Sequence, residues 1–248
     1  MKKSIAILLF VTITISSGKL FAAGQDINYK IGDEAFTGYL YSPKAANGHA
    51  IILVHDWDGL TDYEKKRSEM LGELGYTVFS VDMYGASVRP TEISEKKKQT
   101  TALYKDRKRM RALLQGALVT ATENGIDTTN AVAMGYCFGG AVALELARSG
   151  ENMKGFASFH GGLTTPEGQG YSDTKGQVLI LHGTADKAVS MDDFATLAEE
   201  LEEAGVKHEM VTYAGAPHAF TVFGSERYRE DADKKSWSRF VGYLSEIL

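Results

Sequence analysis

Short apolar runs alternate with longer amphipathic stretches along most of this chain. The runs lie at residues 51–54, 76–81, 131–134, 156–159, 178–181 and 209–213. Runs that are apolar throughout suit strands buried on both faces, as central strands of a parallel sheet are. The amphipathic stretches between them predict crossover helices on both faces of that sheet. The sequence therefore predicts an α/β fold with a mostly parallel central sheet.

Apolar side chains recur at helical spacing in four of the intervening stretches. These are residues 63–74, one longer helix over 103–118, 191–201 with Ser190 in the N-cap position, and 237–248. Segments 85–100 and 161–175 are interpreted instead as loops long enough to act as lids.

An apolar pair of segments precedes the first of these central strands. Residues 27–31 and 35–41 are separated by Gly32-Asp33, a dipeptide that suits a hairpin turn. We therefore expect two antiparallel strands at an edge of the sheet.

Composition excludes several classes of protein. The 248 residues include 27 Lys and Arg, 32 Asp and Glu, and 1 Cys, and the net charge is −5. A single cysteine excludes an intramolecular disulfide framework and any multi-cysteine metal site. The acidic balance, with no basic block beyond residues 96–98, argues against nucleic-acid binding as the main activity.

The first residues have the order of a secretory signal peptide. Lys2 and Lys3 precede an uncharged apolar run over residues 5–15, and small residues follow at Ala22, Ala23 and Gly24. The run is shorter than the roughly 20 residues of a spanning helix, so we expect no stable membrane anchor. An uncleaved anchor is the alternative.

We therefore expect residues 1–23 to be a cleaved signal peptide, with cleavage after Ala22, Ala23 or Gly24. Residues 24–248 would then form a single domain that is periplasmic or secreted.

The segment GYCFGG, residues 135–140, directly follows an expected strand and precedes a helical run. Cys137 stands at the apex of this sharp turn, and small neighbours let the chain pass without collision. The positive end of the following helix favours a thiolate, and the N–H of Phe138 points to a developing oxyanion. The pattern predicts a nucleophile; a buried, inert cysteine in a glycine-rich turn is the alternative.

A nucleophile needs a base, and the base needs a group that orients it. Asp186 lies just past the strand at 178–181, and His218 lies just past the strand at 209–213. The chain order of nucleophile, acid and histidine is that of hydrolases. His160, which also ends a strand, is the competing candidate for the base.

The segment HDWDG, residues 55–59, follows the first central strand. In a hydrolase layout this loop supplies the second oxyanion N–H, for which Trp57 is the candidate, and Asp56 would then face the thiol. Two alternatives remain. Asp56 or Asp58 caps the next helix, or His55, Asp56 and Asp58 hold a metal ion.

Taken together, these motifs resemble the dienelactone hydrolase family, a cysteine-nucleophile branch of the α/β-hydrolases, over about residues 26–246. The resemblance implies an α/β-hydrolase fold and a triad of Cys137, Asp186 and His218. It also implies an oxyanion hole from the N–H groups of Trp57 and Phe138. Asp56 matches the position of an acidic residue, usually Glu, that contacts the nucleophile in the family.

The expected activity is hydrolysis of a small ester, thioester or lactone through an acyl-enzyme, without metal or cofactor. Tyr84, Tyr136 and Phe220 are expected to line an apolar or aromatic substrate pocket. Family members specific for dienelactones use an arginine where this chain has Val222, and the net negative charge argues against an anionic substrate. We expect a monomer or a weak homodimer.

A second hypothesis belongs to another class. An exposed thiol in an oxidising compartment can be oxidised, which would suit a non-catalytic or redox-sensing binding protein.

Overall fold

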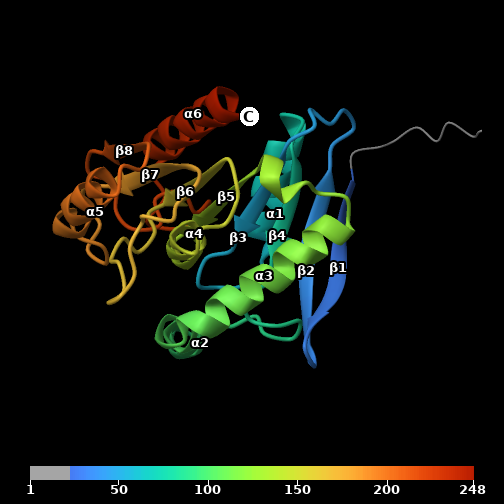
Figure 1. Ribbon diagram of the computed structural model, residues 1–248. Helices are drawn as coiled ribbons and strands as arrows, with labels where there is room; N and C mark the ends of the chain where they lie inside the picture. Colours follow the sequence, from blue (N-terminus) through green and yellow to red (C-terminus); the bar gives the residue numbers. More distant parts are fainter. Residues whose placement is uncertain (1–22) are drawn as a thin grey trace, which may run out of the picture.

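The computed structural model describes residues 23–248 (Figure 1). The signal peptide predicted over residues 1–23 lies outside the described residues, apart from Ala23. Eight strands form a sheet in the order β1-β2-β4-β3-β5-β6-β7-β8. Their bounds are β1 Ala23–Ile31, β2 Glu34–Ser42, β3 Ala50–Val54, β4 Thr77–Val81, β5 Ala131–Tyr136, β6 Gly155–Phe159, β7 Gln177–Gly183 and β8 His208–Tyr213.

Strands β3 to β8 are parallel wherever they pair with one another, as the apolar runs predicted. Strands β1 and β2 form the predicted antiparallel hairpin, with Gly32 at φ +60° in its turn. The prediction that both are edge strands was wrong for β2, which also pairs antiparallel with β4. Of the two hairpin strands, β1 alone lies at the edge of the described sheet, where it pairs with β2 only.

Helices cover both faces of the sheet (Figure 1). Alternate residues of one strand point to opposite faces, so Ile52 and Val54 pack on one side while Ile51 and Leu53 pack on the other. The first side is covered by α3 (Arg107–Glu123), α4 (Phe138–Arg148) and α5 (Met191–Glu203), and the second by α1 (Asp62–Glu73) and α6 (Glu230–Ile247). Within residues 23–248, no helix combines the length and the apolar character that crossing a membrane requires.

The helix predicted over 103–118 is in fact two helices. Helix α2 runs over Ile93–Lys105 and α3 over Arg107–Glu123, with Asp106 between them at φ −121° and ψ 78°. The Asp106 carboxylate accepts from the Arg109 N–H at 2.8 Å and thereby caps α3. Helix α2 also occupies part of segment 85–100, so the prediction of a loop there was wrong beyond residue 92.

Candidate active site

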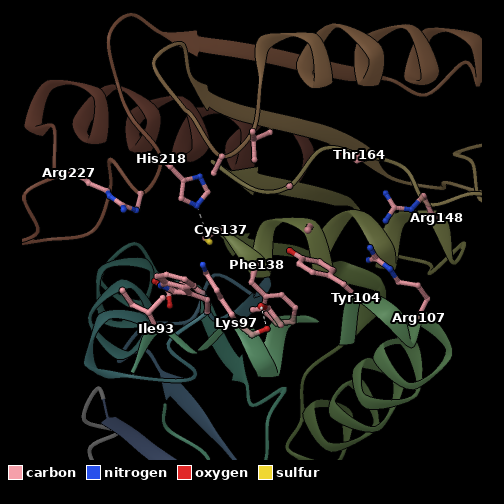
Figure 2. Close-up of a pocket in the computed structure, with 18 residues that line it drawn as sticks. Ile93, Lys97, Tyr104, Arg107, Cys137, Phe138, Arg148, Thr164, His218 and Arg227 are labelled. Carbon is pink, nitrogen blue, oxygen red and sulfur yellow. Dashed lines mark hydrogen bonds between the residues drawn. The ribbon is translucent and has the colours of Figure 1, made fainter. Parts of the chain in front are cut away.

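Cys137 joins β5 to α4 and has φ +51° and ψ −112°, a backbone conformation that side-chain-bearing residues rarely adopt. Gly135 and Gly139, two residues before and after Cys137, have no room for a side chain. A Cβ on Gly135 would lie 2.2 Å from the Gly139 carbonyl, and one on Gly139 would lie 2.2 Å from the Val54 oxygen. The turn therefore brings the following helix directly against β3 and presents the sulfur in a cavity (Figure 2).

The loops after β7 and β8 bring Asp186 and His218 to this sulfur. His218 Nε2 lies 3.0 Å from Cys137 Sγ, and its Nδ1–H donates to Asp186 Oδ2 at 2.7 Å. The other Asp186 oxygen accepts from the N–H groups of Ala188 and Val189 at 2.8 and 3.0 Å. The three predicted residues therefore form a continuous chain of contacts.

The environment sets the charges of this chain. Burial alone would lower the pKa of His218, but its interactions with Asp186 and Cys137 raise the pKa to about 10. Burial likewise opposes ionisation of Asp186, yet the hydrogen bond from His218 keeps the pKa of this carboxyl below its ordinary value. An imidazole that holds its proton at neutral pH can stabilise a thiolate beside it.

His160, the competing candidate for the base, lies beneath the site and is fully buried. Its Nδ1 accepts from the Cys137 N–H at 3.2 Å, and its Nε2 lies 2.8 Å from Thr221 Oγ1. Both ring nitrogens are thus occupied inside the protein, so the alternative that His160 is the base was wrong.

Trp57 and Phe138 both line the same cavity, Trp57 from the loop after β3 and Phe138 from the first turn of α4. Among the hydrogen bonds of residues 23–248, neither amide has a partner. Phe138 is the first residue of α4, where N–H groups are unpaired in general, whereas Trp57 lies in the loop before α1.

Asp56 also lines the cavity with Cys137, but no hydrogen bond joins the two in the described structure. Its carboxylate instead accepts from the Asp58 N–H at 2.7 Å. Burial raises the pKa of Asp56 to about 6. The structure therefore places Asp56 in the wall of the same cavity as the nucleophile, without a hydrogen bond between the two in residues 23–248.

The two alternatives for this loop were wrong. Thr61 caps α1, in a reciprocal capping box with Glu64, so neither Asp56 nor Asp58 does. Both His55 nitrogens face backbone groups. Nδ1–H donates to the Asp56 oxygen at 2.6 Å, and Nε2 accepts from the Met83 N–H at 3.1 Å. The His55 ring therefore stabilises the loop through these backbone contacts and has no free nitrogen for a metal ion.

The cavity has a volume of about 700 Å³, and α2 forms much of its wall. The contributing residues are Ile93, Lys97, Thr100 and Tyr104 (Figure 2). These four residues recur at the spacing of one helix face. The sequence therefore contained a signal for this wall, which was missed because residues 85–100 were interpreted as a loop.

The predicted aromatic pocket residues lie outside the lining. Tyr136 and Phe220 are fully buried among the side chains under α1 and α6, on the other face of the sheet. Tyr84 packs against His55 and Phe138, and its hydroxyl donates to the Trp57 oxygen at 3.3 Å. The prediction was wrong for Tyr136 and Phe220 because they pack on the opposite face of the sheet, and for Tyr84 because it lies behind Phe138 and His55 rather than in the lining. The aromatic lining consists of Trp57, Tyr104 and Phe138.

Positive charge surrounds the cavity although the whole chain is acidic. The lining includes one carboxylate, Asp56, and four cations: Lys97, Arg107, Arg148 and Arg227. Figure 2 shows Arg107 and Arg148 at one end and Arg227 on the opposite side of Cys137. Local charge governs the potential in a cleft, so the net charge of the chain does not by itself decide whether the cavity takes an anionic substrate.

Arg107 makes few hydrogen bonds inside the protein. Its Nη1 lies 3.4 Å from Glu145 Oε2, and its Nε is buried without a partner in the described structure. Arg148, in contrast, pairs with Glu145 at 2.9 Å and donates to the Tyr171 hydroxyl at 2.6 Å.

The family model, the curated relatives and the solved structures that match this chain agree with one another. The dienelactone hydrolase family model matches residues 36–248. A Salmonella typhimurium protein provisionally named a carboxymethylenebutenolidase is 23% identical over 227 residues, which cover 87% of this chain and 84% of that protein.

Among solved structures, m3DLH superposes with a TM-score of 0.83 at 28% identity, covering 91% of this chain and 98% of its own. A dienelactone hydrolase-like promiscuous phosphotriesterase from metagenomic libraries has a TM-score of 0.84 at 26% identity, covering 92% and 99%.

Proposed function

This chain belongs to the dienelactone hydrolase family and is a hydrolase, and from that premise we propose that it cleaves esters, thioesters or lactones with Cys137 as the nucleophile. The observation that carries the proposal is the chain of contacts from Cys137 Sγ to His218 Nε2 at 3.0 Å and from His218 Nδ1 to Asp186 at 2.7 Å.

In the first half of the reaction, His218 holds the proton of the Cys137 thiol, and the thiolate attacks the substrate carbonyl carbon. The carbonyl oxygen becomes an oxyanion that accepts from the N–H groups of Trp57 and Phe138. The bond from carbon to the leaving oxygen or sulfur then breaks, and His218 donates its proton to the leaving group. The acyl group remains on Cys137 as a thioester.

In the second half, His218 takes a proton from water, and the resulting hydroxide attacks the thioester carbonyl. The carbon–sulfur bond breaks, the acid is released, and Cys137 returns as a thiolate beside protonated His218. Asp186 holds the imidazole with Nδ1–H inward throughout, so that Nε2 faces the reacting atoms.

The cavity wall supports a substrate with an apolar or aromatic part and a negative charge. Trp57, Tyr104 and Phe138 would contact the apolar part, and the guanidinium of Arg107, which lines the cavity, would pair with a carboxylate. The proposed substrate keeps the apolar or aromatic part expected from the sequence, contacted by different residues, and carries an anionic group as well.

Active-site titration tests the proposal. Iodoacetamide should modify Cys137, and loss of p-nitrophenyl ester hydrolysis should follow the modified fraction one to one. Cys137→Ala should lose at least 10³-fold in kcat, whereas His208→Gln, remote from the cavity, should retain the activity. A Cys137→Ala enzyme with full activity would contradict the proposal.

The non-catalytic or redox-sensing hypothesis is not favoured, because the relatives are hydrolases. It predicts no turnover of any short aryl or alkyl ester, with an oxidation state of Cys137 that follows added oxidant. The same titration separates the two hypotheses.

We also propose export. Strand β1 begins at Ala23, so cleavage after Ala22 would leave the hairpin complete, whereas cleavage after Gly24 would remove two of its paired residues. N-terminal sequencing of the native protein tests both points, and an intact Met1 would contradict them. Gel filtration tests the expected monomer or weak homodimer.

A further inference from the structure

A buried polar chain lies beneath the site and takes no part in the reaction described above. It begins at His160, passes through Thr221 to the Tyr63 hydroxyl, 2.8 Å from Thr221 Oγ1, and reaches Arg67 and Asp233. His160, Thr221 and Arg67 are fully buried.

Backbone strain is concentrated at the same place. Among residues 23–248, the non-glycine residues with positive φ are Cys137 at 51°, His160 at 42° and Ala219 at 61°. Such conformations persist only where surrounding contacts hold them. All three belong to segments that the His160 ring touches, since it also packs against the rings of His218 and Phe220 at 5.4 and 5.3 Å.

The hydrogen-bond partners determine the tautomer of His160. The Cys137 N–H is shared between the Phe159 oxygen at 3.0 Å and His160 Nδ1 at 3.2 Å. Because an N–H can only donate, Nδ1 faces it with a lone pair, and the ring proton is on Nε2. Nε2–H then donates to Thr221 Oγ1 at 2.8 Å. Burial, reinforced by the charge of His218, holds the pKa of His160 well below its ordinary value, so the ring stays neutral.

We propose that His160 and Thr221 are positioning residues, which tie the backbone of the nucleophile to the loop that carries His218. The contacts close a circuit. Cys137 Sγ meets His218, the chain continues three residues to Thr221, and Thr221 returns through His160 to the Cys137 N–H. This circuit rests on the proposed role of Cys137 and holds the 3.0 Å approach of sulfur to imidazole.

Removing the Thr221 hydroxyl alone should break the circuit. His160 Nε2–H would then lie buried without an acceptor, unless the ring took the other tautomer. That tautomer points Nδ1–H at the Cys137 N–H, so two donors would oppose each other and the strained turn would lose a support.

The test compares Thr221→Val, which keeps the shape of the side chain, with Thr221→Ser, which keeps its hydroxyl. For Thr221→Val we expect the rate of Cys137 alkylation by iodoacetamide at pH 7 to fall roughly ten- to hundredfold, because small misplacements of reacting groups cost about that much. The kcat for ester hydrolysis should fall in parallel with KM unchanged, and Thr221→Ser should restore both rates to within about threefold.

Equal alkylation and kcat for Thr221→Val and wild type would overturn the proposal, as would a Thr221→Ser variant as slow as Thr221→Val. A thermal melt monitors folding, and Thr221→Ala, read by the same criteria, replaces a valine variant that lacks a cooperative transition. Alkylation involves no ester substrate, so a failure of this proposal is distinguishable from a failure of the proposed hydrolysis.

Discussion

Asp186 and His218 are joined by a 2.7 Å hydrogen bond, and the second oxygen of Asp186 is held by two backbone N–H groups. The carboxylate can therefore neither rotate away nor exchange partners without breaking backbone contacts. The loop after β7 therefore fixes the position of Asp186, which fixes the His218 imidazole beside the sulfur of Cys137.

Asp186→Asn should lower kcat by roughly 10²–10⁴-fold, because an amide can donate to Nδ1 and thereby favour the wrong imidazole tautomer. Steady-state hydrolysis of a p-nitrophenyl ester measures the loss. The control is Asp192→Asn, an exposed residue in the first turn of α5, which should stay within about twofold of wild type. A fully active Asp186→Asn enzyme would exclude this carboxylate from the mechanism.

Arg107→Gln should reduce kcat/KM for an ester that carries a carboxylate by roughly tenfold, the scale of one charge-assisted hydrogen bond, and leave a neutral ester of similar size nearly unaffected. Arg111→Gln is the matched control, since Arg111 also pairs with Glu145 but does not line the cavity. If both variants treat the two esters alike, the anionic part of the proposed substrate is wrong.

The break between α2 and α3 gives a prediction on stability. Asp106→Ala should lower the free energy of unfolding by about 1 kcal/mol, because the α3 cap bond to the Arg109 N–H is lost. Glu92→Ala is the control, because Glu92 occupies the N-cap position of α2 without a side-chain cap bond, and it should change by less than about 0.5 kcal/mol. Urea unfolding measures both values.

Glu64 gives a prediction on pH. Burial, reinforced by the charge of Asp56, raises the pKa of Glu64 from 4.5 to about 8. Between these values the folded state retains a proton that the unfolded state has lost, so the free energy of unfolding falls as pH rises. Glu64→Gln removes this contribution, and its free energy of unfolding should fall less between pH 5 and pH 8.

Urea unfolding at the two pH values checks this expectation, with Glu73→Gln, exposed at the end of α1, as the control that should follow wild type. Parallel pH profiles for Glu64→Gln and wild type would show that Glu64 titrates alike in the folded and unfolded states.

Strand-level features were predictable because they depend on local pattern. The turn at Cys137 follows from a buried strand, two glycines and a helical run, all within a short segment. Asp186 and His218 could be placed beside it because the carboxyl ends of parallel strands meet at one edge of a sheet.

The misplaced aromatic residues show where local reasoning needed one more step. Val132, Met134 and Tyr136 alternate along β5 and share one face, opposite the face that α4 covers. The period of two therefore already excluded Tyr136 from the cavity.

The break at Asp106 falls in a charged run, residues 105–109, between the apolar residues Leu103 and Met110. The Asp106 cap of α3 is therefore also a local signal, which the apolar spacing of Leu103 and Met110 obscured.

The central strands, the hairpin and the sharp turn at Cys137 are determined by the sequence itself, since apolar period and backbone freedom act between near neighbours. Tertiary structure alone decided that α2 walls the cavity, that cations gather there in an acidic protein, and that His160 reaches Thr221. Those relationships join residues distant along the chain, and they depend on which side chains the packed sheet leaves facing one another.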